Sequence, residues 1–157
     1  MSTLQRAIEI AVEAHKGQAD KAGAPYLLHS LRVMLSLKTE DERIVGVLHD
    51  VVEDCQGWSF ERLEAEGFPL KIIDALRSVT KNEAEEKSLE KATDEEAKFI
   101  AYWDFVSRAI RNPIGKQVKL ADLRDNCDLS RIEKPSEKDH ARLKRYQRVL
   151  ERIRIEI

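Results

Sequence analysis

The chain has 157 residues, of which 42% are hydrophobic, and this length suits one domain with a core of its own, over residues 1–157. Its 27 Lys and Arg residues and 29 Asp and Glu residues are interspersed, and the formal net charge of −2 indicates neither a nucleic-acid-binding surface nor an acidic tail. No apolar run approaches the length that spans a membrane, so we expect no membrane partner and a cytoplasmic protein.

Apolar residues recur at helical spacing along nearly the whole chain, and no alternating strand of useful length interrupts them. The pattern therefore predicts an all-α fold, a single compact helical bundle. In chain order, the expected helices cover residues 3–15, 27–37, 41–54, a short stretch after Ser59, 69–79, a long stretch from Thr93, a stretch opened by Pro113, and 138–155. Between the first two helices, residues 20–26 predict a turn, a type of connection that often carries functional residues.

One segment lacks the pattern of its neighbours. Residues 80–92 are charged and have no apolar face of any width. Such a segment is typical of a mobile loop or a frayed helix, which makes it the candidate lid of the molecule.

The stretch GVLHDVVEDC, residues 46–55, places four ionisable groups in apolar surroundings; they are His49, Asp50, Glu53 and Asp54. At about 100° per residue, all four share one face of the expected helix with Gly46, where a missing side chain lets a ligand or another helix come close. Taken alone, a His-Asp dipeptide is explained by the solvated face of an amphipathic helix. Two further polar residues in apolar segments favour another explanation.

His29 in PYLLHSLRVM and Asp122 in VKLADLRDN also lie where core residues are expected. Burying unpaired charges is unfavourable, and one metal ion would account for all of these groups because it neutralises the carboxylates. Together with the His-Asp pair, the two residues give a mixed set of nitrogen and oxygen donors that suits a divalent transition ion. The Glu-Asp pair of the same stretch is then left for acid-base work.

His29, the His-Asp pair and Asp122 match, in this order, the His…His-Asp…Asp signature of the HD-domain metal-dependent phosphohydrolases, a helical superfamily. More closely, the chain resembles the (p)ppGpp hydrolase domain of RelA/SpoT-type enzymes and their small stand-alone alarmone hydrolase relatives. The matching segments are AHKGQ, DKAGAPYLLH, LHDVVED, SVTK and VKLADLRDN. The resemblance implies a helical HD domain that hydrolyses a phosphorylated nucleotide.

The resemblance also implies a role for each matching residue. The implied ligands of one divalent ion, Mn²⁺ or another transition metal, are His29, His49, Asp50 and Asp122. The implied catalytic acidic pair is Glu53 and Asp54. Asn126 matches an asparagine that contacts the nucleotide in this family, and Lys21 matches a lysine near the phosphates. The further candidates for balancing the phosphate charge of the substrate are Lys81 and Arg124.

The chain departs from the family pattern in three segments. Asp20 stands where the alarmone hydrolases carry an arginine that helps to hold the guanine nucleotide, His29 is followed by Ser30 in place of proline, and ADRLHN becomes ADLRDN over residues 121–126. An acid at position 20 adds a repulsive group, which predicts weak or absent hydrolysis of (p)ppGpp. Alternatively, Asp20 pairs with Lys21 or Arg124 and shapes a pocket for a less charged substrate.

We therefore expect metal-assisted hydrolysis of a phosphate ester or pyrophosphate of a small nucleotide, with a (p)ppGpp 3′-pyrophosphohydrolase as the nearest model. Glu53 or Asp54 would hand a proton to the leaving oxygen, and the sequence does not distinguish between them. The alternatives are a nucleotide monophosphatase or phosphodiesterase of the same superfamily, and a non-catalytic helical interaction module. The oligomeric state is left open.

Overall fold

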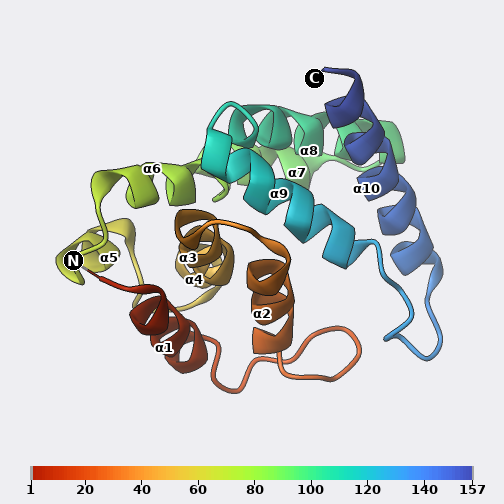
Figure 1. The fold of residues 1–157 in the computed structure, drawn as a ribbon. Helices are drawn as coiled ribbons and strands as arrows, with labels where there is room; N and C mark the ends of the chain where they lie inside the picture. The colour runs from red at the N-terminus through yellow and green to blue at the C-terminus, as the bar shows by residue number, and fades with distance from the viewer. Residues whose placement is uncertain (1, 157) are drawn as a thin grey trace.

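The computed structural model describes residues 2–156, and its regular structure is helical, which confirms the all-α prediction (Figure 1). The helices in chain order are α1 (Leu4–Ala14), α2 (Leu27–Ser36), α3 (Glu40–Leu48), α4 (Val51–Asp54), α5 (Phe60–Ala65), α6 (Leu70–Ser78), α7 (Glu83–Lys91), α8 (Glu95–Ala109), α9 (Pro113–Asn126) and α10 (Glu137–Ile155). Within the described residues there is no β-strand, only an isolated antiparallel bridge between Ala19 and Pro25. Among residues 2–156, no helix is both long and apolar enough to cross a membrane.

Helix α3 lies at the centre, where it packs against α1, α2, α6 and α9, and α10 packs on the far side of α8 and α9 (Figure 1). The buried apolar side chains form two clusters. The first is built mainly from α1 to α6, and the second from α8, α10 and the end of α9. Ala121 of α9 belongs to the first cluster and Leu123 to the second. Asp122, which lies between Ala121 and Leu123 on α9, is therefore placed where the two clusters meet.

Side-chain caps define where several helices begin, and these starts agree with the sequence-based expectation. The hydroxyls of Thr3, Ser59 and Ser136 each accept a hydrogen bond from a backbone N–H of the first turn. The Asn112 side chain caps α9, with Pro113 as the first helical residue. Such caps satisfy N–H groups that have no partner within the helix, which is why the residue type is visible in the sequence.

The expected single helix over residues 41–54 is wrong, because the chain turns at His49 and Asp50. Helix α3 ends at Leu48, α4 begins at Val51, and Asp50 has φ −104° and ψ 0°, outside the helical region. The apolar positions run on through the turn, so their spacing does not reveal it.

Gly46 of α3 accommodates a neighbouring helix rather than a ligand. A Cβ atom there would lie 2.5 Å from Cδ1 of Leu37 and 3.6 Å from the Cα of Met34 in α2. The missing side chain therefore lets α2 approach α3, and both helices carry residues of the candidate site. Of the two explanations for this glycine, close helix packing is the one that the structure supports.

Of the two alternatives for residues 80–92, a mobile loop or a frayed helix, the structure shows a helix. These residues contain helix α7, whose first turn is capped by Asn82. Arg108 of α8 binds Glu85 through Nε and Nη2, at 2.7 and 3.2 Å, and also donates to the carbonyl of Thr80. Leu89 of the same helix packs against the second apolar cluster. Residues 83–91 are therefore anchored to α8 by polar and apolar contacts, which argues against a mobile lid.

Helix α9 approaches α6 closely at Gly115, and this contact gives a test of the packing. A Cβ atom at Gly115 would lie 2.9 Å from the carbonyl oxygen of Ala109 and closer still to Oγ of Ser78. We expect Gly115→Ala to lower the free energy of unfolding by about 1–3 kcal/mol, because the backbone must shift to admit the methyl group. Urea unfolding measures the change. Gln117→Ala, an exposed substitution on the same helix, serves as the control. An equal stability of the two variants would contradict the packing at Gly115.

Candidate active site

Four side chains from three separate segments converge beneath the surface. They are His29 of α2, His49 and Asp50 of the turn after α3, and Asp122 of α9. Nε2 of His29 lies 3.0 Å from Oδ1 of Asp122, and Nε2 of His49 lies 3.0 Å from Oδ2 of Asp50. The donor atoms of His29, His49 and Asp122 all lie within 4.8 Å of one another, as a metal site requires. Oδ2 of Asp50 completes the group within 3.8 Å of both imidazoles.

The two imidazole rings are oriented by acceptors on their outer side. Nδ1 of His49 lies 2.6 Å from the carbonyl oxygen of Gly46, and Nδ1 of His29 lies 2.6 Å from Oδ2 of Asp125. With the proton on Nδ1, each ring presents the lone pair of Nε2 to the centre of the group, the arrangement typical of histidines that bind metals.

Nε2 of His49 supplies the observation that tests whether a cation fits. This atom is buried and makes no hydrogen bond with any group in the described part of the chain. Burial lowers the pKa of His49, but the carboxylates of Asp50 and Asp122 outweigh it and raise the pKa well above its ordinary value. A positive charge between the four residues is therefore favourable, whether it is a proton or a cation. Two nitrogen and two oxygen donors suit a divalent transition ion.

Asp122 is held from both sides along α9. Nζ of Lys119 lies 2.8 Å from Oδ2, and Nδ2 of Asn126 donates to Oδ1 at 3.0 Å. Lys119 is itself buried, with Nζ 5.2 Å from the ring centre of Tyr102. Although burial raises it, the pKa of Asp122 lies well below the usual range because of Lys119 and the histidines. Lys119 was not predicted, although a lysine one turn before an aspartate in the apolar stretch VKLAD was an available signal.

Three more contacts around the site were not predicted. Asp125 accepts from His29 and also from Arg32, whose Nε and Nη2 lie 2.8 and 3.1 Å from its two oxygens. Tyr26 donates a hydrogen bond from its hydroxyl to Oδ2 of Asp50. Asp125, Arg32 and Tyr26 thereby orient His29 and Asp50 without belonging to the central group. No local pattern marks them, because their partners lie far away in the chain.

The acidic pair of α4 lies beside this group, and its two members differ. Glu53 forms an ion pair with Lys81, so this lysine faces an acidic side chain of the site. Desolvation, together with the negative charges of Asp50 and Glu53, raises the pKa of Asp54 to about 6, although Asp54 keeps contact with solvent. Of the two carboxyl groups, Asp54 is the one that the structure equips to carry a proton near neutral pH.

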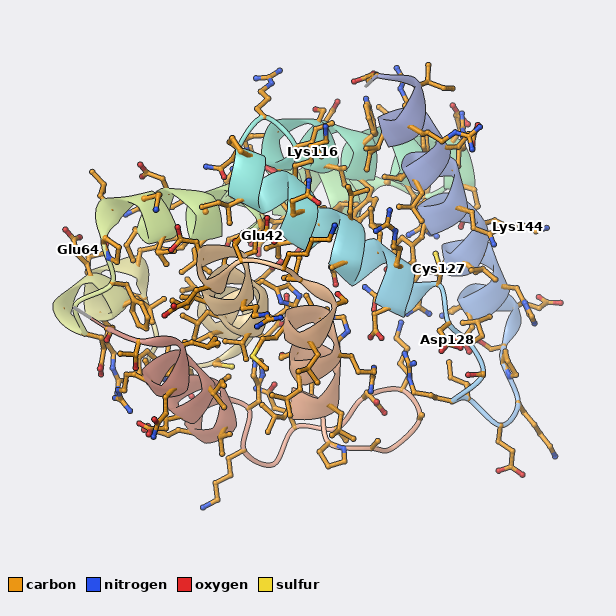
Figure 2. All side chains as sticks on the ribbon, viewed as in Figure 1. Glu42, Glu64, Lys116, Cys127, Asp128 and Lys144 are labelled. Atoms are coloured by element: carbon orange, nitrogen blue, oxygen red, sulfur yellow. The ribbon has the colours of Figure 1, made fainter. Side chains whose placement is uncertain are left out.

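A cavity of about 360 Å³ opens beside His29 and Tyr26. Its walls come from the loop after α1, from α2, from the end of α9 with the loop that follows it, and from α10. In Figure 1 the two loops extend on the same side of the bundle, and Figure 2 labels Cys127 and Asp128 where α9 ends next to them. Lys21 and Asn126, two of the predicted substrate contacts, line this cavity.

Other predicted residues lie elsewhere. Arg124 is exposed and lines a groove with Lys38 that adjoins the cavity beside His29, since Arg32, Asp125 and Asp128 line both, but Arg124 itself does not line the cavity. Lys81 is not among the residues of the cavity wall. Tyr146 of α10 is in that wall and was missed, and its ring centre lies 5.5 Å from that of the buried Tyr102.

Asp20 pairs with neither of the two cations that we considered for it. Its Oδ1 accepts hydrogen bonds from the backbone N–H groups of Ala22 and Ala24, both at 2.9 Å, and no ion pair to Lys21 or Arg124 occurs within residues 2–156. An aspartate that bonds its own backbone in this way closes a tight turn. The pairing that we considered as an alternative is therefore wrong, and Asp20 shapes the loop that forms one wall of the cavity.

No protein-family model matches the chain. A protein of Arabidopsis thaliana named putative GTP diphosphokinase RSH1, chloroplastic, is 34% identical over 132 residues, which cover 76% of this chain and 14% of that protein. The guanosine-3′,5′-bis(diphosphate) 3′-pyrophosphohydrolase of Spiroplasma citri is 36% identical over 85 residues, 52% of this chain and 11% of that protein.

A solved structure described as a metazoan ortholog of SpoT that hydrolyzes ppGpp is similar along almost the whole chain. It superposes with a TM-score of 0.73 at 25% identity, and the alignment covers 96% of this chain and 85% of that one. The chain thus spans a small part of its sequence relatives, 11–14% of their length for those named here, and most of this structural neighbour.

Proposed function

Because the chain is a homologue of the SpoT-type guanosine-3′,5′-bis(diphosphate) 3′-pyrophosphohydrolases, we propose that it is a metal-dependent phosphohydrolase that cleaves a phosphate ester or pyrophosphate of a nucleotide. The observation that carries the proposal is the convergence of two imidazoles and two carboxylates beside a cavity of ligand size. We further propose that residues 1–157 form one HD domain.

We propose that one divalent ion, Mn²⁺ in the first instance, is held by the set of His29, His49, Asp50 and Asp122. A divalent ion in such a site supplies Lewis acidity toward a phosphoryl oxygen and a water of lowered pKa. Gly46 and Asp125 keep the Nε2 lone pairs of the two histidines turned inward, and Lys119 holds the Asp122 carboxylate in place.

Residues next to this set would donate the proton and contact the substrate. The Asp54 carboxyl group would donate its proton to the leaving oxygen, since its raised pKa keeps a proton available close to neutral pH. Glu53, which is paired with Lys81, would hold α4 in place and thereby position Asp54. Lys21 and Asn126 would contact the substrate from the cavity wall.

The test is a screen of the purified protein with Mn²⁺ against a panel of phosphorylated nucleotides, with the products separated by ion-exchange chromatography. Release of pyrophosphate identifies a pyrophosphohydrolase, release of orthophosphate a monophosphatase, and an opened diester a phosphodiesterase. Protein stripped with a chelator should be inactive and should recover with added Mn²⁺. A protein that binds the ion stoichiometrically and hydrolyses nothing would support the non-catalytic module instead.

A further inference from the structure

The cavity beside the candidate metal site has balanced charges. Four of its wall residues are cations: Lys21, Arg32, Arg131 and Arg142. Four others are carboxylates: Asp20, Asp125, Asp128 and Asp139. The formal charge of the wall is therefore zero, which is unusual for a site that must attract a highly phosphorylated ligand.

Each of the three arginines is already engaged by an aspartate of the same wall. Arg32 binds both oxygens of Asp125 at 2.8 and 3.1 Å. Nη1 of Arg131 lies 3.1 Å from Oδ2 of Asp128, and Nη2 of Arg142 lies 3.1 Å from Oδ1 of Asp139, so both arginines form ion pairs. A phosphate group could bind these guanidinium groups only by competing with carboxylates that are held next to them.

Lys21 differs from the arginines, because no ion pair is found for it over the described range 2–156. Its neighbour Asp20 faces the same cavity, and the turn that holds Asp20 Oδ1 keeps this carboxylate in the wall. A phosphate that approaches Lys21 therefore also approaches the carboxylate of Asp20. The attraction to Lys21 is largely cancelled by the repulsion from Asp20.

The rest of the wall is apolar or neutral. Leu129, Ile132 and Leu143 supply aliphatic surface, Tyr146 an aromatic ring and Asn126 an amide. The volume of about 360 Å³ lies in the range of small-molecule sites. A flat heterocycle with a sugar matches this combination, since its faces are apolar and its edges form hydrogen bonds.

From the proposed function, on which this step rests, we infer that the cavity holds an uncharged nucleoside moiety and that the substrate carries phosphate only at the end that faces the metal site. A second diphosphate at the opposite end would have to leave water for a wall with no net positive charge, beside the Asp20 carboxylate. The chain therefore prefers a nucleotide phosphorylated at one position over one that is phosphorylated at both ends.

The experiment compares a nucleoside 3′-diphosphate with the matching 3′,5′-bis(diphosphate), for several bases, on the Mn²⁺-loaded protein. Both ligands offer the same group to the metal site, so their difference reports on the cavity. We expect kcat/KM at least tenfold higher for the 3′-diphosphate, mostly through KM, and a dissociation constant lower by a similar factor in calorimetry.

Variants separate the charge of Asp20 from its role in the turn. In Asp20→Asn the amide oxygen can still accept from Ala22 and Ala24, so the loop is kept and only the charge is lost. We expect this variant, and Asp139→Asn, which releases Arg142, to reduce the preference several-fold. Asp74→Asn, an exposed substitution on α6, is the matched control and should leave the preference unchanged.

Two failures are distinguishable. If the protein hydrolyses nucleotides but handles the bis(diphosphate) as well as or better than the 3′-diphosphate, the inference about the cavity is wrong and the proposed function stands. If neither ligand is hydrolysed, and the panel of phosphorylated nucleotides also gives no product, the proposed function is wrong. The calorimetric comparison then decides about the cavity: tighter binding of the 3′-diphosphate supports the inference, and equal or weaker binding overturns it.

Discussion

Replacing His49 with alanine should abolish both stoichiometric binding of Mn²⁺ and hydrolysis. Its Nε2 lies 3.0 Å from Asp50 and 3.4 Å from Asp122, so the ring is the donor that joins the two carboxylates. Without the His49 ring, the ion would be left with the two carboxylates and the imidazole of His29 as its only donors from the set. We expect the affinity for the ion to fall by at least two orders of magnitude, more than the 10- to 100-fold loss that removal of an outer partner causes. Metal analysis after dialysis and initial rates at saturating Mn²⁺ measure the two losses.

His140→Ala is the control, because His140 is an exposed histidine of α10 that does not line the cavity. Since His49 is buried, circular dichroism must show that the variant folds, and His29→Gln gives a second test at another donor. Full occupancy of the ion in the His49→Ala protein would refute the proposed ligand set.

Most helices were predictable because their signals are local. A hydroxyl or amide before an apolar-periodic stretch marks a start, as Thr3, Ser59 and Asn112 do, and this information needs no knowledge of the fold. The turn at His49 and Asp50 was not predictable in this way. Its apolar neighbours keep helical spacing on both sides, and the break depends on packing within the folded chain.

In the site, too, some residues carry a local sequence signal and others do not. The four donors carry a signal of their own, since each is a polar residue in an apolar stretch, and the structure brings them together. Their supports, among them Arg32, Asp125 and Tyr26, are recognisable only through partners that are remote in sequence. For Arg124 the local signal misled, because this cation is close to Asp122 in the chain but does not line the cavity beside His29.

Asp54→Asn and Glu53→Gln should reduce turnover far more than they reduce affinity for the ion. Neither side chain belongs to the group of four donors, so we expect the dissociation constant of Mn²⁺ to change by no more than about threefold. A general acid typically contributes a factor of about 10²–10⁴, and we expect a loss of at least 10² in kcat for Asp54→Asn. The loss of kcat for Glu53→Gln should be smaller than for Asp54→Asn, because Glu53 is paired with Lys81 and only positions Asp54.

The pH dependence identifies which carboxyl group gives the proton. A general acid works in its protonated form, and the pKa of Asp54 is raised to about 6, so kcat of the unmodified protein should fall as the pH rises above that value. The positive charge of a bound ion lowers this pKa and moves the decline toward lower pH, without changing its direction. In Asp54→Asn the decline should disappear along with most of the rate, whereas Glu53→Gln should keep it. Loss of bound Mn²⁺ with unchanged turnover per remaining ion, or an unaltered decline in Asp54→Asn, would remove Asp54 from the proposed role.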